Sequence, residues 1–386
     1  MSDPVTFRTL FRDLPAPAQD PAALGQGVFA DTALRELIAT NQIVAEDPIL
    51  DAQIQPASLD LRLGRYAYRV RASFLPGGSS VDEKLRSFTM HRVDMEDGAV
   101  LERGCVYIVP LQERLQLQGG ISALANPKSS TGRLDIFTRV ITDNATAFDK
   151  IAGGYGGPLY LEIAPRTFSV LVRRGTRLSQ IRFQRGSDIK VGVGVAELHR
   201  RSPLISGIPG EPLFRDKLVG VTVDLEGDGD TGLVGYRAKK HADVIDVDCR
   251  ERYDIAPFWE PIASRDRRII LDPDDFYILV TREAVTIPPD FAAEMVAYDT
   301  MVGEFRVHYA GFFDPGFGWG GEGSGSRAVL EVRSHEVPFL LEHGQTVGWL
   351  RYERLTAPPS RLYGAGAGSS YQKQGLQLAK QFKRLG

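Results

Sequence analysis

The chain has 386 residues, which is enough for two or three domains. Hydrophobic residues make up 43% and charged residues 25%, as in an ordinary globular protein, so disordered, collagen-like and coiled-coil classes are excluded. The formal net charge is −3, which argues against extended nucleic acid as a partner. A polyanionic ligand would need a local cluster of cations and amides, because the global field does not attract it.

Location and metal chemistry are restricted by what the sequence lacks. No stretch reaches the roughly 18 apolar residues of a membrane helix, and the first 20 residues lack the order of a signal peptide. We therefore expect a cytoplasmic protein with no membrane partner. Two cysteines, Cys105 and Cys249, and six histidines exclude a disulfide framework and a Cys-rich zinc site. The H-x-E and P-C-x-x-C motifs of zinc deaminases are also absent, so we expect no zinc and no metal site of the protein itself.

In chain order, the sequence predicts few helices and many strands. Residues 1–30 predict an N-terminal extension, because they are rich in Pro, Ala and Asp without sustained periodicity. Residues 32–40 predict a short amphipathic helix capped by Asp31 or Thr32. Beyond them, β-branched and aromatic runs alternate with Gly, Pro and Asp turns, which predicts a mainly β protein. The clearest runs are 107–109, 159–163, 169–172, 276–280 and 329–332.

The same order of segments appears twice. Leu161-Glu-Ile, Gly175 and Ile181-Arg-Phe match Leu330-Glu-Val, Gly344 and Leu350-Arg-Tyr, each pair 169 residues apart. A repeat this long indicates duplication of a whole domain, since solenoid units are much shorter. We expect a first domain over 31–200, a linker rich in Pro and Gly over 201–218, and a second domain over 219–386.

The segment 126–133, Asn-Pro-Lys-Ser-Ser-Thr-Gly-Arg, has the composition of a phosphate-binding loop. Lys128 and Arg133 supply positive charge, Ser129 and Ser130 supply hydroxyls, and the turn supplies backbone amides. It is not a P-loop, because no G-x-x-x-x-G-K-[ST] occurs in the chain. The alternative is a polar loop that caps a helix.

Each domain carries a glutamate inside an otherwise apolar strand. These are Glu162 in the first domain and its repeat partner Glu331 in the second. Burial raises the pKa of a carboxyl group, and a Glu poised between its charged and neutral forms can act as general acid and base. The alternative for both is a position on the solvent side of the strand.

Two later segments could shape a ligand pocket. Residues 312–319 form a sharp aromatic turn around Asp314, which is equally typical of a hairpin corner. In the tail, a Gly-rich hinge precedes Tyr371, Lys373 and Gln374, which suits a lid that excludes water; a disordered terminus is the alternative. Four basic residues are interpreted as a solvated face: Arg166, Arg173, Arg174 and Arg177.

Together these segments resemble the dCTP deaminase branch of the deoxyuridine-triphosphatase-like superfamily. The matching motifs are Leu59-Asp-Leu-Arg-Leu-Gly, Lys128-Ser-Ser-Thr-Gly-Arg-Leu, the Asp314-Pro-Gly-Phe turn, the Leu-Glu strands and Tyr371-x-x-Gln. The resemblance covers residues 32–200 and 219–380. It implies two tandem dUTPase-like domains, each a distorted barrel of the β-clip type with few short helices.

The two domains depart from the family pattern in opposite ways. The first keeps the loop and Glu162 but lacks the Asp-Pro-Gly turn. The second keeps the turn, Glu331 and the lid, while Asp299 and Glu304 stand where the basic loop should be and would repel a triphosphate. Because family sites lie between subunits of a trimer, we expect a composite site in which the first domain gives the loop and Glu162 and the second gives the turn and lid. The resemblance also implies a homo-oligomer with threefold or pseudo-threefold packing.

The activity implied by the resemblance is deamination of dCTP to dUTP and ammonia in pyrimidine deoxynucleotide metabolism. Glu162 is the expected proton shuttle, and Mg²⁺ is expected to be bound with the nucleotide triphosphate. Residues expected to bind the nucleotide are Lys128, Ser129, Ser130, Arg133, Asp314, Tyr371, Lys373 and Gln374. The alternatives are a dUTP diphosphatase, a bifunctional dCTP deaminase and dUTPase, and a non-catalytic nucleotide-binding regulator.

Overall fold

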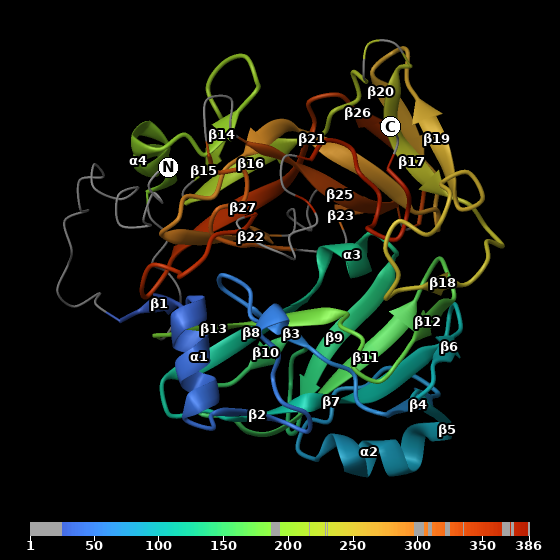
Figure 1. The fold of residues 1–386 in the computed structure, drawn as a ribbon. Coiled ribbons are helices and arrows are strands. Elements are labelled where there is room, and N and C mark those ends of the chain that lie inside the picture. Colours follow the sequence, from blue (N-terminus) through green and yellow to red (C-terminus); the bar gives the residue numbers. More distant parts are fainter. Residues whose placement is uncertain are drawn as a thin grey trace, which may run out of the picture.

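A computed structural model describes residues 25–186, 194–215, 217–227, 229, 231–296, 305–307, 311–320, 325–334, 336–364, 371 and 374–384. Figure 1 shows two β-rich halves stacked on one another, with the first half in blue to green and the second in yellow to red. Most of the expected N-terminal extension, residues 1–24, lies outside the described residues.

The first half contains two main sheets and the few helices of its part of the chain. Its helical elements are α1 (Asp31–Ala39), η3 (Asp51–Gln53), α2 (Val81–Phe88) and α3 (Ser129–Gly132). One sheet runs β5 (Thr89–Asp94), β4 (Tyr66–Val70), β7 (Val106–Gln116), β11 (Gly156–Pro165), β9 (Ile136–Thr142), with β2 (Ile43–Ala45) on β7. The other runs β1 (Gly27–Val28), β13 (Ser179–Arg185), β8 (Ile121–Pro127), β10 (Lys150–Ile151), with β3 (Leu59–Leu61) on β13.

The second half repeats this plan after α4 (Val195–Arg201). One sheet runs β19 (Trp259–Ala263), β17 (Leu233–Ala238), β21 (Tyr277–Val285), β25 (Ser326–Ser334), β23 (Phe305–Val307), with β14 (Ile205–Ser206) on β21. The other runs β15 (Phe214–Arg215), β16 (Leu218–Thr222), β27 (Thr346–Arg354), β22 (Phe291–Val296), β24 (Phe312–Phe313). The remaining strands form two small sheets: β6 (Ala99–Leu101) with β12 (Val170–Val172) and β18 (Ile245–Asp246), and β20 (Arg268–Leu271) with β26 (Phe339–Glu342).

Strand order and register confirm the predicted duplication and the mainly β fold. The central strands β7, β11 and β9 correspond to β21, β25 and β23. Glu162 lies opposite Ile108, and Glu331 lies opposite Ile278, so the two glutamates occupy equivalent positions. The predicted strand runs all fall in these strands, to within one residue. The two halves therefore offer the same backbone framework for a site.

The predicted helix is confirmed as α1, but the predicted cap is wrong. Ala30 precedes the helix and makes no side-chain cap bond, and Asp31 is already the first helical residue. The buried Asp31 carboxylate instead accepts hydrogen bonds from the backbone N and the Oγ of Ser360, the former at 2.7 Å. A long-range partner thus replaced the local cap that the sequence suggested.

The hydrophobic cores do not divide the chain at the expected linker. Leu198 and Ile205 pack into the core of the second half, so the chain enters this half before residue 201. The core of the first half also takes side chains from the second: Trp259 packs edge-on against Phe168, and Phe382 packs against Trp259. This shared packing fixes the two halves against one another. No helix in the described part of the chain is both long and apolar enough to cross a bilayer.

Candidate functional site

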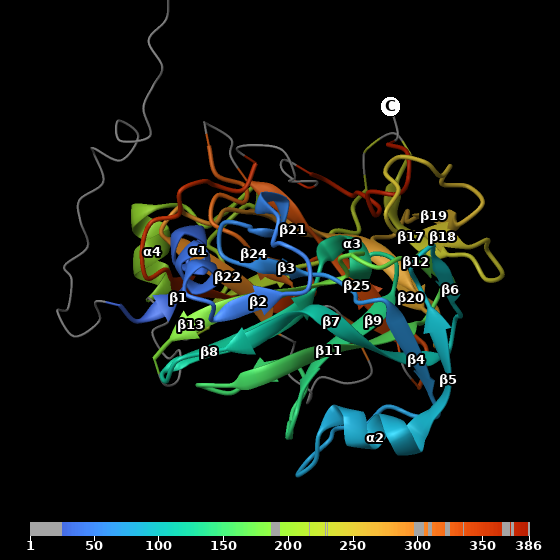
Figure 2. The same ribbon diagram turned by 60° about the horizontal axis from the view of Figure 1, so that its bottom comes forward.

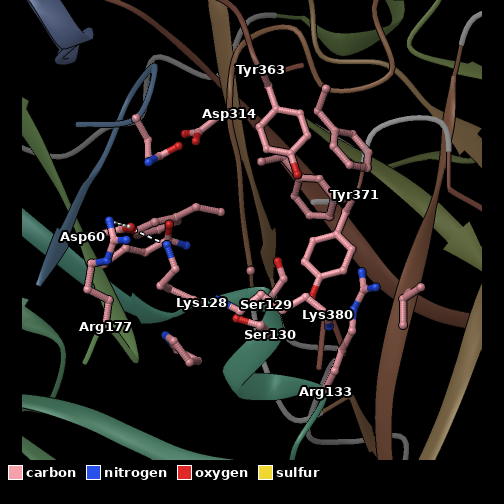
Figure 3. A pocket seen from close by; sticks show the side chains of 18 of the residues that line it. Asp60, Lys128, Ser129, Ser130, Arg133, Arg177, Asp314, Tyr363, Tyr371 and Lys380 are labelled. Carbon is pink, nitrogen blue, oxygen red and sulfur yellow. Dashed lines mark hydrogen bonds and ion pairs between the residues drawn. The ribbon is translucent and has the colours of Figure 1, made fainter. Parts of the chain in front are cut away.

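A cavity of about 500 Å³ lies between the two halves and is lined by both. Figure 3 shows its wall, with the short helix α3 at its base. Charged and polar residues of the first half that line it are Gln55, Asp60, Lys128, Ser129, Ser130, Arg133, Arg177 and Gln180. Those of the second half are Asp248, Arg250, Asp314, Glu331, Tyr363, Tyr371, Gln374 and Lys380.

The predicted phosphate loop forms one side of this cavity. Strand β8 ends at Pro127, and the chain turns at Lys128 directly into α3, which places Ser129 and Ser130 at the cavity wall. The Lys128 ammonium forms an ion pair with the buried carboxylate of Asp60. Arg177 Nη1 lies 3.4 Å from the other carboxylate oxygen of Asp60. The loop thus carries positive charge that is partly balanced by Asp60.

Arg177 was missed by the sequence analysis. Its side chain is partly exposed, as the predicted solvated face requires, but Arg177 also lines the cavity and pairs with Asp60. Asp60 itself belongs to the Leu59–Gly64 motif, and strand β3 carries it to the cavity by pairing with β13. That long-range pairing has no signal in the local sequence around Arg177.

Arg133, at the end of the loop, contacts several residues of the second half. Its guanidinium donates to the side-chain oxygen of Gln374 at 2.9 Å and to the carbonyl of Gln377 at 3.0 Å. It lies 3.8 Å from the ring centroid of Tyr371, a cation–π distance. Its Nε is 3.9 Å from Glu331 Oε1. The loop, the tail and strand β25 therefore converge on one buried arginine.

Glu331 is the glutamate that reaches the cavity. It is 6% exposed, and burial raises the pKa of its carboxyl group to about 7, an effect that the charge of Arg133 opposes in part. A carboxyl group in this range exists in both protonation states at neutral pH. It can therefore take up and return a proton without a large energetic penalty.

Glu162, the expected proton shuttle, does not line the cavity. In the register of the first half it lies directly opposite Arg139 on β9. Its Oε1 accepts from Arg139 Nε at 2.9 Å, and Arg139 in turn donates to Ser73 and lies 3.5 Å above the ring of Phe148. The carboxylate is thus buried in a cross-strand ion pair within the first half. The expectation that the first half supplies both loop and glutamate is corrected: the loop and the cavity glutamate come from different halves.

Asp314 reaches the cavity through the predicted turn. Gly316 has φ +90°, and a Cβ there would stand 2.7 Å from the Cβ of Leu362, so glycine is required where the turn packs on the chain. Asp314 Oδ1 lies 3.4 Å from Nη2 of the buried Arg182. Burial raises the pKa of the Asp314 carboxyl group, while Arg182 lowers it.

The tail reaches the cavity, but it is not a free lid. Tyr371 and Gln374 line the cavity, as expected of a lid, while Lys373 lies outside the described residues. Beyond them, Leu378 and Phe382 are buried in the hydrophobic core that the two halves share, and Phe382 lies 5.5 Å from Phe258 between ring centroids. The tail is therefore a strap anchored at its far end.

This anchor brings Lys380, which the sequence analysis did not select, to the cavity. Its backbone N–H donates to the hydroxyl of Tyr371 at 3.1 Å. Burial, together with the charges of Lys128 and Arg250, lowers the pKa of Lys380 to about 8. The apolar spacing of residues 376, 378, 379 and 382 is the signal that could have indicated an anchored tail.

Replacing Phe382 by Ala should lower the free energy of unfolding by about 3–5 kcal/mol, because it empties an aromatic position in the core. It should also weaken ligand binding in the cavity, since Gln374 and Lys380 depend on the anchored strap. Denaturant unfolding and a titration with dCTP measure the two effects. The partly buried Phe88, at the end of α2, gives a matched control whose replacement by Ala should cost less stability and leave binding unchanged. Wild-type stability in the Phe382 variant would contradict the anchor.

The described residues also bear on metal binding. Among them, no three His, Cys, Asp or Glu side chains come together in a group that could hold a metal ion. The carboxylates of Asp60 and Asp314 are instead turned to Lys128 and Arg182.

Comparison with known proteins covers both halves. Residues 25–187 match the family model of the 2'-deoxycytidine 5'-triphosphate deaminase (DCD) N-terminal domain, and residues 193–382 match that of the C-terminal domain. A crystal structure of 2'-deoxycytidine 5'-triphosphate deaminase from Agrobacterium tumefaciens is 58% identical, with a TM-score of 0.82. The match covers 86% of this chain and 99% of that one.

Curated relatives match over a shorter stretch. The "dCTP deaminase, dUMP-forming" of Beutenbergia cavernae is 34% identical over 113 residues, which are 28% of this chain and 55% of the relative. The protein of the same name from Halobacterium salinarum is 33% identical over 119 residues, 30% of this chain and 57% of the relative. The chain thus spans little more than half the length of these relatives.

The duplicated β framework, the basic Ser-Ser loop and the buried glutamate agree with these matches, which together extend over residues 25–382. The chain belongs to the 2'-deoxycytidine 5'-triphosphate deaminase family.

Proposed function

We propose that this protein is a hydrolase that acts on a cyclic amidine C–N bond and converts dCTP and water to dUTP and ammonia. The observation that carries the proposal is the position of Glu331, a buried carboxyl group with a pKa of about 7 beside Arg133 in a cavity with the basic Ser-Ser loop. Such a cavity joins a group able to move protons with a set of donors for a triphosphate.

In the proposed reaction, the Glu331 carboxylate accepts a proton from water while the water oxygen attacks carbon 4 of the cytosine ring. The bond between carbon 4 and the amino nitrogen then breaks, and the protonated Glu331 returns the proton to the departing amine. The electron pair of the C4=N3 double bond, which moves to N3 when water adds, re-forms that bond as the amine leaves. The 4-hydroxy ring then loses its hydroxyl proton to solvent while N3 takes one up, which gives the uracil ring. The amine leaves as ammonia, and Glu331 ends as it began. Acid–base assistance of this kind contributes about 100- to 10,000-fold to rate.

The triphosphate would bind the positive side of the cavity. Lys128, Ser129 and Ser130 offer donors from the loop, and Arg177 and Lys380 add charge from two distant segments. Phosphate oxygens would replace the Asp60 carboxylate as partners of Lys128 and so weaken the Lys128–Asp60 ion pair. Mg²⁺ would arrive with the nucleotide and neutralise its phosphate oxygens. Holding the substrate in one orientation would supply much of the remaining acceleration.

Assembly and location follow from the same proposal. We propose a homo-oligomer with threefold or pseudo-threefold packing that acts in the cytoplasm on free nucleotides. The cavity contains both the loop and Glu331 from one chain, which supports one site per chain in such an assembly.

The proposal is tested by incubating the purified protein with dCTP and Mg²⁺ and measuring ammonia, dUTP, dUMP and pyrophosphate. Ammonia with an equal amount of dUTP is the expected result. Two relatives are named "dUMP-forming", so dUMP is the second product to look for. Formation of ammonia, dUMP and pyrophosphate would show a bifunctional enzyme. Pyrophosphate from dUTP without ammonia from dCTP would indicate a diphosphatase. Binding of dCTP without any product would indicate a regulator.

A further inference from the structure

We propose that the buried ion pair between Asp135 and Arg333 is a positioning device that holds Arg133 beside Glu331 across the two halves. The inference rests on the proposed deamination. Neither Asp135 nor Arg333 is among the residues that line the cavity, so they act through their neighbours. Both are positioning residues rather than catalytic ones.

Two of the ion pairs between the halves, Arg133–Glu331 and Asp135–Arg333, are offset by two residues on each side. Arg133 and Asp135 follow α3, and Glu331 and Arg333 lie on β25. Residues two apart in a strand project to the same face, so Glu331 and Arg333 both face the first half. Arg133 meets Glu331 at 3.9 Å, and Arg333 Nε meets Asp135 Oδ1 at 3.3 Å. The first half supplies the cation of one pair and the anion of the other. Sliding one half by two residues would therefore bring like charges together.

The Asp135–Arg333 pair is held more firmly than the pair it supports. Arg333 binds both oxygens of Asp135, and its remaining donors reach Thr167 Oγ1 at 2.9 Å and the carbonyl of Asp274 at 2.6 Å. The Thr167 hydroxyl donates to Asp135 Oδ2 at 2.6 Å. Asp135 is 1% exposed and Arg333 is 6% exposed. A bidentate pair with this many fixed partners sets the distance between the segment after α3 and strand β25, and does not only attract them.

Arg133, by contrast, has no direct hydrogen bond to Glu331 that would fix their separation, since 3.9 Å exceeds a hydrogen-bond length. Its other partners, Gln374 and Gln377, belong to the strap. The effect of Arg133 on the protonation of Glu331 therefore depends on how the halves are held. A misplacement of about 1 Å in a site can lower turnover about 100-fold.

The internal repeat gives independent support. The residue equivalent to Arg333, two positions after Glu162 on β11, is Ala164. Both β11 and β25 carry the glutamate, but only β25, whose glutamate lines the cavity, has an arginine two residues later. A general requirement of the fold for charge at this position would apply to both strands.

The backbone at Asp135 guides the choice of variants. Its φ is +55°, a left-handed conformation that Asp and Asn tolerate better than other side chains. Asp135→Asn therefore removes the charge and keeps the backbone preference. Arg333→Met removes the other charge, and Arg333→Lys keeps it while losing the bidentate geometry. Arg139→Met removes a buried ion pair of the first half and serves as the control for lost stability.

The experiment measures kcat, KM and the pH dependence of dCTP deamination at a temperature where each variant is folded. Asp135→Asn and Arg333→Met should lower kcat about 10- to 100-fold with KM within a few-fold, and Arg333→Lys should recover part of the loss. The acidic limb of kcat/KM should move to higher pH, because Arg133 would stabilise the Glu331 carboxylate less. Arg139→Met should keep the wild-type kcat and acidic limb.

A second readout does not depend on activity. The carboxyl group of Glu331, labelled with ¹³C, can be titrated by NMR in the substrate-free protein. Its pKa should rise in Asp135→Asn, which keeps the size of the side chain and the backbone preference at position 135. An unchanged Glu331 pKa with wild-type kcat would overturn the positioning role and leave a merely structural ion pair. An equal loss of kcat in Arg139→Met would also overturn it. Wild-type protein that releases no ammonia from dCTP would instead contradict the proposed function, and the NMR titration would still decide the positioning role.

Discussion

Replacing Glu331 by Gln should lower kcat for dCTP deamination about 100- to 10,000-fold, whereas Glu162→Gln should keep kcat within a few-fold of wild type. Glutamine has the shape of glutamate but cannot take a proton from water. Glu331 lines the cavity beside Arg133, and Glu162 is held by Arg139 inside the first half. Ammonia release at saturating dCTP measures both variants.

The free energy of unfolding of each variant serves as the control, because the two substitutions should change it differently. Glu331→Gln removes a carboxyl group that burial already disfavours as an anion, so folding should be little affected. Glu162→Gln leaves Arg139 without its ionised partner, which should lower the free energy of unfolding; the 24% exposure of the arginine limits that loss. Activity lost in Glu162→Gln and retained in Glu331→Gln would reverse the assignment.

The same pair of glutamates shows how far sequence reasoning reaches. The repeat predicted that Glu162 and Glu331 are equivalent, and the strand register confirms it. It could not predict which one faces the ligand. For Glu162, the neighbouring strand β9 places Arg139 directly opposite, and this pairing depends on a strand register that local composition does not encode.

Residues close in sequence to a motif were easier to predict than residues brought in by long-range packing. Lys128, Ser129, Ser130 and Arg133 form one continuous segment, and the structure places all four at the cavity. Lys380 and Arg177 come from segments with no motif of their own. They reach the cavity because the strap is anchored in the core and because β3 pairs with β13.

The pH dependence of kcat/KM should have a narrow maximum between about pH 7 and pH 8. Glu331 must be ionised to accept a proton from water, and burial raises the pKa of its carboxyl group to about 7. Below that value the rate should fall tenfold per pH unit, as the carboxylate is lost. Lys380 must be charged to attract phosphate, and its pKa is lowered to about 8. Above that value kcat/KM should fall to a plateau about 10- to 150-fold lower, since one charged hydrogen bond is worth about 1.5–3 kcal/mol.

Two variants assign the limbs to their residues. The residual rate of Glu331→Gln should lack the acidic limb, while a limb caused by ionisation of the terminal phosphate of dCTP would persist in it. Lys380→Met should lower kcat/KM at pH 7 and lack the alkaline limb. An alkaline limb that survives in Lys380→Met would contradict the role of this lysine.

The alkaline limb should also differ between kcat/KM and kcat. Only kcat/KM reports groups of the free enzyme, and kcat reports them in the substrate complex. In the free protein, Lys380 is surrounded mainly by positive neighbours, Lys128 and Arg250, which together with burial lower its pKa. A bound triphosphate reverses the sign of the local charge and should raise that pKa well above 8. The limb near pH 8 should therefore be present in kcat/KM and absent from kcat. Binding of dCTP at pH 8.5 should also take up a proton from the buffer. Calorimetry in buffers of different ionisation enthalpy measures this proton uptake directly.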